Sequence, residues 1–440
     1  MFRENLLRAL KHRNYRLFFS GQIISLIGTW IQQLAMSWLA YRLTRSPLML
    51  GVIGFTGQIP VFFLSPFAGV LSDRLNRHRL LIITQSLAMV QALTLAILVL
   101  TGTINIVWLV GLSLFLGTVN AFDIPIRQSF VVQMVDNRED LGNAIALNST
   151  MINSARMIGP SIAGILVSLV GEGICFLING LSYLAVIWAL LMMKVKPRMS
   201  ANPEKKLLSE LKEGFTYVFS FPPLRSIILL VALISLVGMS YVVILPVYVK
   251  DILKGGAYTQ GMLMSSVGLG ALLAALFLAS RPKVVGLESY IPVASGVIGI
   301  GLIGFSFVKV LWLALPMLFI IGLGMIIQMA SANTIIQTIV EEDKRGRVMS
   351  IYTMAFMGMG PFGSLLIGSL AEKINVMGAF RIGGIFCLAG AVLFILQIKN
   401  FHHTVRSIYL KMGLISPNLP ELETIVESSQ NAVEFDERQS

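Results

Sequence analysis

The sequence predicts an all-α integral membrane protein of twelve transmembrane helices, arranged as two pseudo-symmetric six-helix bundles with both termini in the cytoplasm. Three observations predict this fold. The 440 residues are 55% hydrophobic and only 13% charged, which is more apolar surface than one water-soluble core buries. Twelve apolar runs approach or exceed the ~20 residues that a spanning helix needs. Most of the 34 Lys and Arg residues flank these runs on the side of both termini, as expected for cytoplasmic loops.

The apolar runs divide the chain into five segments. Residues 1–16 form a cytoplasmic N-terminal segment, 17–193 and 226–398 form the two bundles, 194–225 form a linker, and 399–440 form an acidic cytoplasmic tail that we expect to be disordered. The linker contains an apolar stripe at helical spacing, which predicts a helix lying on the cytoplasmic leaflet. The predicted spans are 17–41, 48–71, 79–101, 105–128, 142–168, 173–193, 226–249, 258–280, 289–308, 310–336, 347–371 and 377–398.

An internal repeat supports the division into two halves. When Gly142 is placed on Gly346, several further positions match in the same register. These matches predict a parallel repeat of six plus six helices, in which substrate binds near the midplane between the halves. The further matched pairs are Gly159 with Gly363, Gly164 with Gly368, Phe176 with Phe380, and Gly180 with Gly384.

A short charged loop joins the second and third spans. Asp73 is followed at close spacing by Arg74, Arg77 and Arg79. An acid among arginines forms a compact ion-pair cluster that is able to latch helices together and release them. Gly69, before the cluster, permits close helix approach. We therefore expect this loop to act in gating.

Asp123 is the acid that the predicted spans place most clearly inside a helix, about one turn from the inner surface. Charged groups in a bilayer are expensive, so functional roles are the default hypotheses. As a latch, Asp123 would pair with Arg77 or Arg74; as a coupling acid, it would bind and release a proton. A third alternative is a carboxylate that is simply satisfied near a helix end. Arg127 lies one turn later and joins the predicted gating and coupling set.

Polar residues at helical spacing predict a substrate cavity, although such stripes also hold helices together. Arg156 lies close to the midplane, so it should face water, substrate or a partner; bonding to helix carbonyls and pairing with Asp123 are the alternatives. The predicted cavity residues are Gln22, Ser25, Thr29 and Gln32 on the first helix, Asn153 and Arg156 on the fifth, and Gln328, Ser331 and Thr334 on the tenth.

The fifth span also contains Gly159, Pro160 and Gly164, which predict a kinked and closely packed helix. Motifs for chemistry are missing from the sequence: it has no phosphate-binding loop, metal-ligand cluster, nucleophile elbow or carboxylate pair. We therefore expect no enzyme activity, cofactor or metal. The net charge of +12 lies at a membrane face, so it does not indicate nucleic-acid binding.

The loop from Gly69 to Arg79 resembles the signature between the second and third helices of the major facilitator superfamily. The Gly159-Pro160 segment is similar to the antiporter signature of that superfamily, although Ala163 replaces one of its glycines. The order of motifs resembles the enterobactin-exporter and macrolide-efflux branch over roughly residues 10–400. These motifs are residues 22–32, 44–47, 69–79, 123–128, 143–148 and 159–160.

This resemblance implies a secondary exporter that works by alternating access and proton antiport. Its substrates would be amphiphilic drugs, siderophores or related metabolites, and it would act in the cytoplasmic (inner) membrane as a monomer. The resemblance also implies a relay formed by Asp73, Arg77 and Asp123. Two alternatives remain: a flippase for lysophospholipid or another lipid, and a non-transporting membrane sensor or scaffold that signals through the acidic tail.

Overall fold

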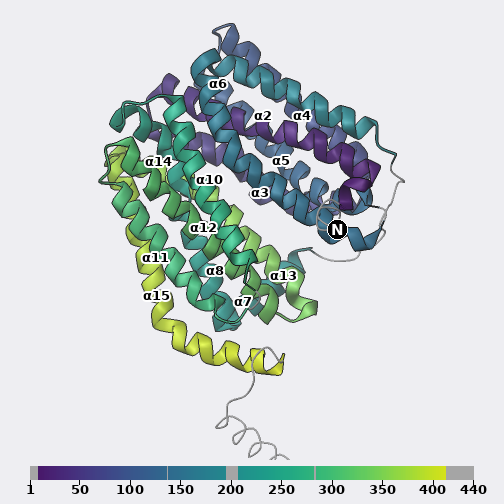
Figure 1. Ribbon diagram of the computed structural model, residues 1–440, viewed down its shortest axis with the longest axis vertical. Coiled ribbons are helices and arrows are strands. Elements are labelled where there is room, and N and C mark those ends of the chain that lie inside the picture. Colours follow the sequence, from purple (N-terminus) through teal and green to yellow (C-terminus); the bar gives the residue numbers. More distant parts are fainter. Residues whose placement is uncertain (1–7, 136, 195–206, 282–283, 413–440) are drawn as a thin grey trace, which may run out of the picture.

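Helices form all the regular secondary structure of the described residues (Figure 1). The computed structural model describes residues 8–135, 137–194, 207–281 and 284–412. In these ranges, 11 helices are long and apolar enough to cross a membrane. They form two groups: α2 to α6 pack on one another, and α8 to α15 do the same.

The first group begins after a short 3-10 helix, η1 (Arg8–Lys11). Two of its helices begin at asparagine caps: Asn76 accepts from the amides of His78 and Arg79, and Asn105 accepts from that of Trp108. The helices are α2 (Arg13–Thr44), α3 (Pro47–Arg74), α4 (Arg77–Leu100), α5 (Ile106–Met134) and α6 (Leu141–Leu191), with the turn η2 (Arg138–Asp140) before α6.

Helix α6 is interrupted at Gly171. Its 51 residues would extend roughly 75 Å as one straight helix, more than twice the ~30 Å of a bilayer core. Gly171 has φ +77°, a conformation that favours glycine, and the helical dihedrals stop there. Directly after this break, the Glu172 carboxylate accepts two hydrogen bonds from Arg42 of α2, at 2.9 and 3.3 Å. The predicted loop between the fifth and sixth spans is thus reduced to a break at one glycine.

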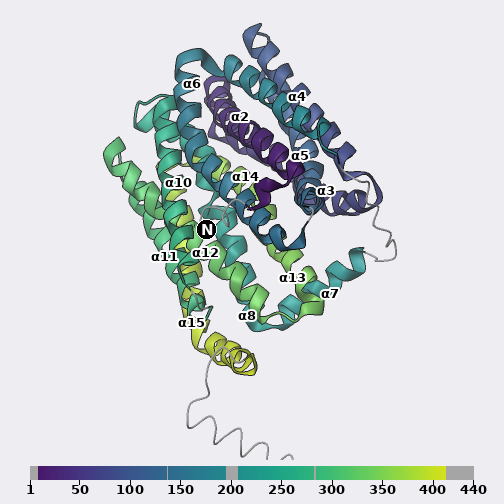
Figure 2. The same cartoon turned by 45° about the vertical axis from the view of Figure 1, so that its right-hand side comes forward.

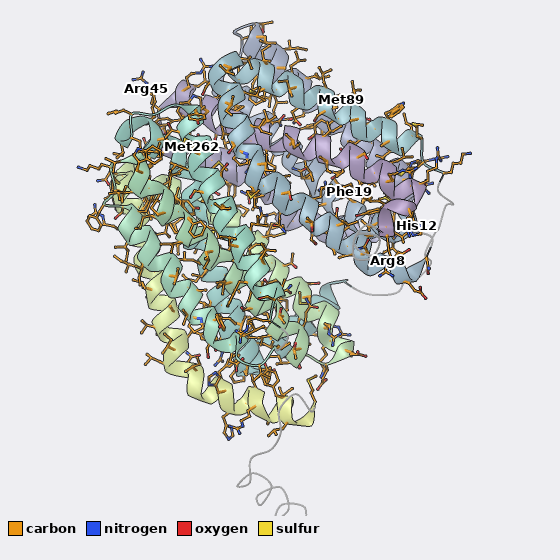
Figure 3. All side chains as sticks on the ribbon, in the orientation of Figure 1. Arg8, His12, Phe19, Arg45, Met89 and Met262 are labelled. Carbon is orange, nitrogen blue, oxygen red and sulfur yellow. The ribbon has the colours of Figure 1, made fainter. Side chains whose placement is uncertain are left out.

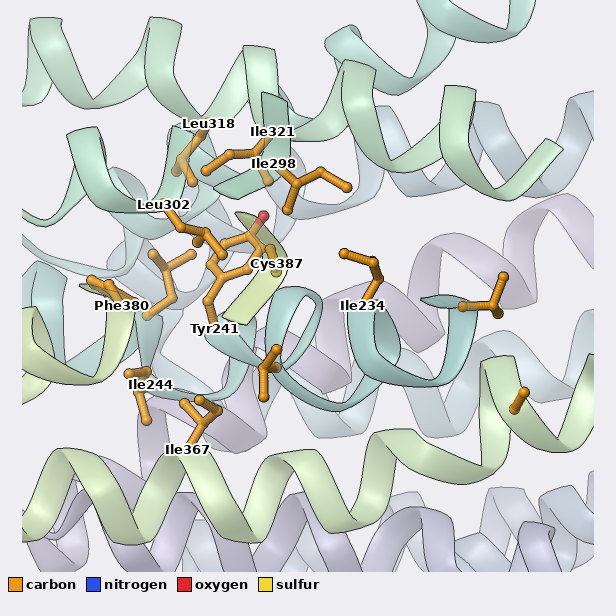
Figure 4. Close-up of a cluster of buried hydrophobic side chains, with 14 of the residues drawn as sticks. Ile234, Tyr241, Ile244, Ile298, Leu302, Leu318, Ile321, Ile367, Phe380 and Cys387 are labelled. Carbon is orange, nitrogen blue, oxygen red and sulfur yellow. The ribbon is translucent and has the colours of Figure 1, made fainter. Parts of the chain in front are cut away.

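The second group surrounds an apolar core that includes Tyr241, Ile298, Leu302, Phe380 and Cys387 (Figure 4). Two of its apolar spans contain irregular turns, at Pro222–Ile252 and Lys344–Lys373. Its helices are α8 (Pro222–Leu233), α9 (Leu245–Val247), α10 (Ala257–Ala279), α11 (Leu287–Phe305), α12 (Leu311–Ile339), α13 (Glu342–Thr353), α14 (Met359–Lys373) and α15 (Val376–Lys411), with the turns η3 (Ile234–Gly238), η4 (Ser240–Ile244), η5 (Tyr248–Ile252) and η6 (Met354–Gly358).

Two glycines that the internal repeat pairs with each other, Gly164 and Gly368, each pack on a glycine of the other group of helices. Gly164 of α6 packs on α10, where an added Cβ would lie 3.1 Å from the Cα of Gly261. Its repeat partner, Gly368 of α14, packs on α3, where an added Cβ would lie 2.9 Å from the Cα of Gly51. Both contacts join the first group to the second, and small residues let the helix backbones approach closely. We name these two contacts the α6–α10 seam and the α3–α14 seam.

The linker contains helix α7 (Leu207–Ser220), which packs on α13 of the second group (Figure 2). Glu213 and Arg347 form an ion pair with 3.1 Å between Oε2 and Nη1. The Lys344 ammonium lies 4.7 Å from the centre of the Tyr217 ring. Helix α7 is therefore attached to the second group of helices.

The last helix, α15, continues beyond the expected span end at residue 398 to Lys411. Phe401, Val405 and Tyr409 recur every four residues and are buried, so this extension packs on the second group. The predicted disordered tail falls on residues 413–440 for the most part, and these lie outside the described residues, as do 1–7 and 195–206.

Candidate functional site

A cavity of about 360 Å³ lies between the two groups of helices. Most of its described wall comes from α2, α3, α4 and α5, with Tyr183 of α6. The second group contributes Val242, Val243, Gln260 and Met264 to this wall. The predicted residues Gln22, Ser25, Thr29 and Gln32 all line the cavity, and so do Asp123 and Arg127.

Asp123 is held by donors from two helices. The residue is buried, with 4% of its surface exposed. Thr84 Oγ1 and Gln85 Nε2, both on α4, donate to Oδ1 at 2.8 and 2.7 Å. Arg127, one turn along α5, places Nε 3.5 Å from Oδ2. This arrangement suits an ionised carboxylate, because charge-assisted hydrogen bonds offset part of the cost of burial.

The predicted gating loop is described only in part. Gly69, Asp73 and Arg74 lie in α3, but the surroundings of Gly69 and the side chains of Asp73 and Arg74 are outside what the structure describes, so the ion-pair cluster stays a prediction. Arg77 begins α4, and its Nη1 lies 3.5 Å from the Ser129 carbonyl oxygen. The relay that the resemblance implied also stays a prediction.

Gln32 takes part in a buried chain of amides. Asn179 Nδ2 of α6 donates to Gln32 Oε1 at 2.7 Å, and Gln32 Nε2 donates to Gln91 Oε1 of α4 at 3.0 Å. Gln91 Nε2 in turn donates to the Leu112 carbonyl of α5 at 3.2 Å. Gln32 therefore lines the cavity and also connects four helices of the first group.

The polar residues of α12 lie outside this cavity. Gln328 and Ser331 are buried within the second group, and Gln328 Nε2 and Ser331 Oγ have no hydrogen-bond partner. Thr334 accepts, through its carbonyl oxygen, a hydrogen bond of 2.8 Å from Thr338. The stripe on α12 thus does not face the cavity that the stripe on α2 lines.

Asn153 and Arg156 also lie outside the cavity wall. Asn153 Nδ2 donates to the Ser149 carbonyl of its own helix at 2.9 Å. Arg156 is exposed. In the described part of the chain, Asp123 forms an ion pair with Arg127, and pairing with Arg156 is not observed.

Gly159, Pro160 and Gly164 lie where α6 contacts other helices. A Cβ added at Gly159 would lie 2.6 Å from the Cβ of Trp30, and one at Gly164 would lie 2.8 Å from the Ala257 carbonyl oxygen. The helix continues through Pro160, and its dihedrals become non-helical at Gly171. Close packing is thus the observed property of these residues, whereas the kink at Pro160 stays a prediction.

The comparison with protein families gives a match over nearly the whole chain. The family model described as transmembrane secretion effector, of the major facilitator type, matches residues 6–411. The chain belongs to this family. The predicted membership of the major facilitator superfamily is therefore confirmed.

The relatives of this chain are transport proteins. It is 27% identical over 399 residues to the staphyloferrin A transporter of Staphylococcus aureus, covering 88% of this chain and 99% of that one. It is 24% identical over 409 residues to macrolide efflux protein A of Streptococcus pyogenes, covering 89% and 98%. The chain is accordingly a transporter, not an enzyme, and a multi-pass protein of the cytoplasmic (inner) membrane with a small-molecule substrate.

A solved structure shows the same fold at low identity. A POT family transporter in complex with 5-aminolevulinic acid superposes with a TM-score of 0.73 at 11% identity, over 88% of this chain and 96% of that one. Among the described residues of the chain, no cluster of three His, Cys, Asp or Glu side chains is arranged to hold a metal ion.

Several residues of the cavity wall were not predicted from the sequence. Gln85, Asn120 and Gln260 line the cavity. Thr84 is outside the wall and donates a hydrogen bond to Asp123. Each is a polar side chain inside an apolar run, which is the signal that could have indicated them. That signal does not say which helices face one another.

A second set of contacts joins the two groups at the end that carries Arg45, opposite to Arg8 and His12 (Figure 3). The Tyr41 hydroxyl donates to the Asp251 carboxylate of η5. Glu372 at the end of α14 accepts from Ser46 Oγ at 2.9 Å and from the Leu48 amide at 3.2 Å. Two carboxylates of the second group thus bind the first group at this end.

Proposed function

We propose that the chain is a secondary active transporter that exports small amphiphilic molecules from the cytoplasm in exchange for protons. The observation that carries this proposal is a buried carboxylate, Asp123, on the wall of a cavity between two groups of helices. Ionisable groups at such depth are costly and mark ion or substrate pathways. The relatives named for macrolide efflux and for staphyloferrin A support a small-molecule cargo, and the former supports outward transport.

The proposal includes twelve membrane spans with both termini in the cytoplasm. Eleven candidate spans occur in the described residues, and one of them is the interrupted helix α6. Division of α6 at Gly171 makes two spans of 31 and 20 residues, each long enough to cross a bilayer. The excess of Lys and Arg on the side of the termini supports the cytoplasmic assignment.

The cavity would open alternately to the two sides of the membrane. The α6–α10 and α3–α14 seams, together with the Asp251 and Glu372 hydrogen bonds, hold the two groups together at the Arg45 end. By the topology above, this end faces outward, so the conformation is closed to the outside. Export requires these contacts to part while the opposite ends approach.

Proton exchange would occur at Asp123. The ionised carboxylate accepts from Thr84 and Gln85 and pairs with Arg127, and each of these interactions weakens when a proton neutralises it. Protonation would therefore loosen the contact between α4 and α5 at the cavity wall. A proton from outside would enter as substrate leaves, and its release to the cytoplasm would restore the ion pair.

Inverted membrane vesicles test this function. Respiration acidifies their interior, and a quenched acridine dye reports the pH gradient. We expect erythromycin, chloramphenicol or tetraphenylphosphonium to restore fluorescence, because substrate uptake into the vesicles is exchanged for protons. Asp123→Asn should abolish the response, since asparagine still accepts from Thr84 and Gln85 but does not exchange a proton.

Glu341→Gln is the matched control, because Glu341 is an acid with a side chain 64% exposed outside the cavity. It should respond like the wild type. A response of Asp123→Asn equal to that of the control would refute coupling at Asp123. If no probe restores the dye fluorescence in vesicles with the wild-type protein, the exporter proposal is refuted.

A further inference from the structure

Three glutamines on the cavity wall have unsatisfied carbonyl oxygens. Gln22 of α2, Gln85 of α4 and Gln260 of α10 are 2%, 5% and 1% exposed, and Oε1 of each is buried without a hydrogen-bond partner. A buried acceptor without a donor is unfavourable, because it has lost its hydrogen bonds to water and gained none in the protein. The residues come from three helices and from both groups, yet all three line one cavity.

The hydrogen bonds of the neighbours fix the amide orientation in two of these glutamines. Gln85 Nε2 faces Asp123, and an ionised carboxylate only accepts. Gln260 Nε2 lies 3.2 Å from the Ser37 hydroxyl oxygen. The Ser37 hydroxyl uses its one hydrogen to donate a hydrogen bond to the Leu34 carbonyl oxygen, at 2.8 Å. Ser37 must therefore accept from Gln260. In both residues the unpartnered atom is the carbonyl oxygen, so the missing partner is a donor.

The charge of the wall is balanced. Asp123 and Arg127 are the charged residues among the described lining residues, and they pair with each other. A cationic ligand would compete with Arg127 for a carboxylate that two further donors already hold. Among the same residues, Tyr183 alone offers an aromatic ring, so the wall provides little cation–π attraction. An anion would meet carbonyl oxygens, which repel it.

We propose that the cavity selects small uncharged molecules that carry several O–H or N–H donors. The cavity of about 360 Å³ is near the lower limit for pockets that bind drug-sized ligands, which are roughly 300–1,000 Å³. The three oxygens are closed off from solvent here, so the glutamine side chains rotate toward the ligand as it enters. Gln85 also holds Asp123, and this rotation would loosen that hydrogen bond. The assignment rests on the proposed function, because it treats the ligand as the exported substrate.

Binding to the purified protein in lipid nanodiscs tests the assignment by calorimetry. Chloramphenicol is uncharged and has three donors, one N–H and two O–H; its diacetate has both hydroxyls masked; tetraphenylphosphonium is a cation without donors. We expect chloramphenicol to bind at least about tenfold more tightly than either other probe, as expected for two hydrogen bonds to buried acceptors. Equal binding of the diacetate or of tetraphenylphosphonium, or no binding of chloramphenicol, overturns the assignment.

Two variants test whether the binding of chloramphenicol depends on a glutamine of the cavity wall. Gln22→Met removes an amide whose buried Oε1 has no hydrogen-bond partner, so the unfolding temperature should stay the same or rise while chloramphenicol binds about tenfold more weakly. Gln328→Met is the control: Gln328 is also buried, at 3% exposure, with an unpartnered amide atom, but it lies outside the cavity. Binding that is unchanged in Gln22→Met, or equally weakened in both variants, overturns the assignment.

The vesicle assay separates this assignment from the proposed function. If chloramphenicol binds with the expected selectivity but no probe drives proton exchange, export fails and the ligand class stands. If tetraphenylphosphonium alone drives proton exchange, export stands and the ligand class fails.

Discussion

Single glycines determine how closely the helices of the two groups approach each other. A methyl group at Gly164 would lie 2.8 Å from a carbonyl oxygen of α10, a distance at which the backbone itself must move. Gly142 lies at the start of the same helix, and a methyl group there would meet no atom within 4 Å. The two positions therefore separate the effect of packing from the general gain in helix propensity, which is about 1 kcal/mol for Gly to Ala.

We expect Gly164→Ala to lower the thermal unfolding midpoint in detergent, because overpacking costs about 1–3 kcal/mol and exceeds the gain in propensity. Gly142→Ala should keep or raise the midpoint. Equal stabilisation of both variants would show that the α6–α10 seam accommodates a methyl group freely.

At the scale of elements, helix α7 lies between the two groups in the sequence, and its described residues pack on α13 and α8 of the second group. The Glu213–Arg347 ion pair and the contact of Lys344 with Tyr217 hold it against α13. Gly214 allows this approach, since an added Cβ would lie 3.1 Å from Ile351 Cδ1. Phe215 and Phe219 remain exposed, as expected for a helix that also meets lipid. Helix α7 should therefore move together with the second group.

Cross-linking tests this attachment. Glu213→Cys with Arg347→Cys, joined by a short bifunctional methanethiosulfonate, should leave proton exchange in vesicles unchanged, because the two helices keep their contact throughout the cycle. The uncross-linked double variant is the control. Loss of exchange on cross-linking alone would mean that α7 must leave α13 during transport.

Element boundaries were predictable where hydropathy changes sharply, and less so elsewhere. The span expected at 105–128 corresponds to α5, which continues to Met134 because Phe130, Val131 and Met134 are buried in the first group. The spans expected at 142–168 and 173–193 are one helix with a break at Gly171. Hydropathy indicates which residues lie in the apolar part of the bilayer, whereas packing on neighbouring helices determines at which residue a helix ends.

The candidate site was predictable along one helix but not between helices. Gln22, Ser25, Thr29 and Gln32 share a face of α2, and 3.6-residue spacing is enough to find them. Gln260 could not be found in this way, because its position on the wall depends on how α10 is rotated against α2. The stripe on α12 has the same spacing and faces away from the cavity, for the same reason.

For the whole molecule, the two seams have to open and close if the proposed cycle is correct. Ser161 and Ser265 face each other across the α6–α10 seam, with 2.5 Å between their hydroxyl oxygens. The sulfur atoms of cysteines at these two positions would be near enough for small side-chain shifts to bring them to the disulfide distance of about 2.05 Å. The native cysteines, Cys175 and Cys387, are both buried and should not interfere.

Ser161→Cys with Ser265→Cys should therefore form a disulfide under mild oxidation and stop proton exchange in vesicles. A reducing agent should restore the exchange, because the cross-link only prevents the seam from opening. Each single variant, oxidised in the same way, is the control. Full exchange by the cross-linked protein would contradict alternating access through this seam.

The cavity wall is unequal in origin, since its described residues come almost entirely from the first group and only Val242, Val243, Gln260 and Met264 come from the second. This unequal contribution affects how the substrate specificity of such a transporter changes in evolution. Changes in the first half of the gene would alter what is carried, while changes in the second half would mostly spare the cargo. A chimera that joins the first half of this chain to the second half of a relative should therefore carry the substrates of this chain and not those of the relative.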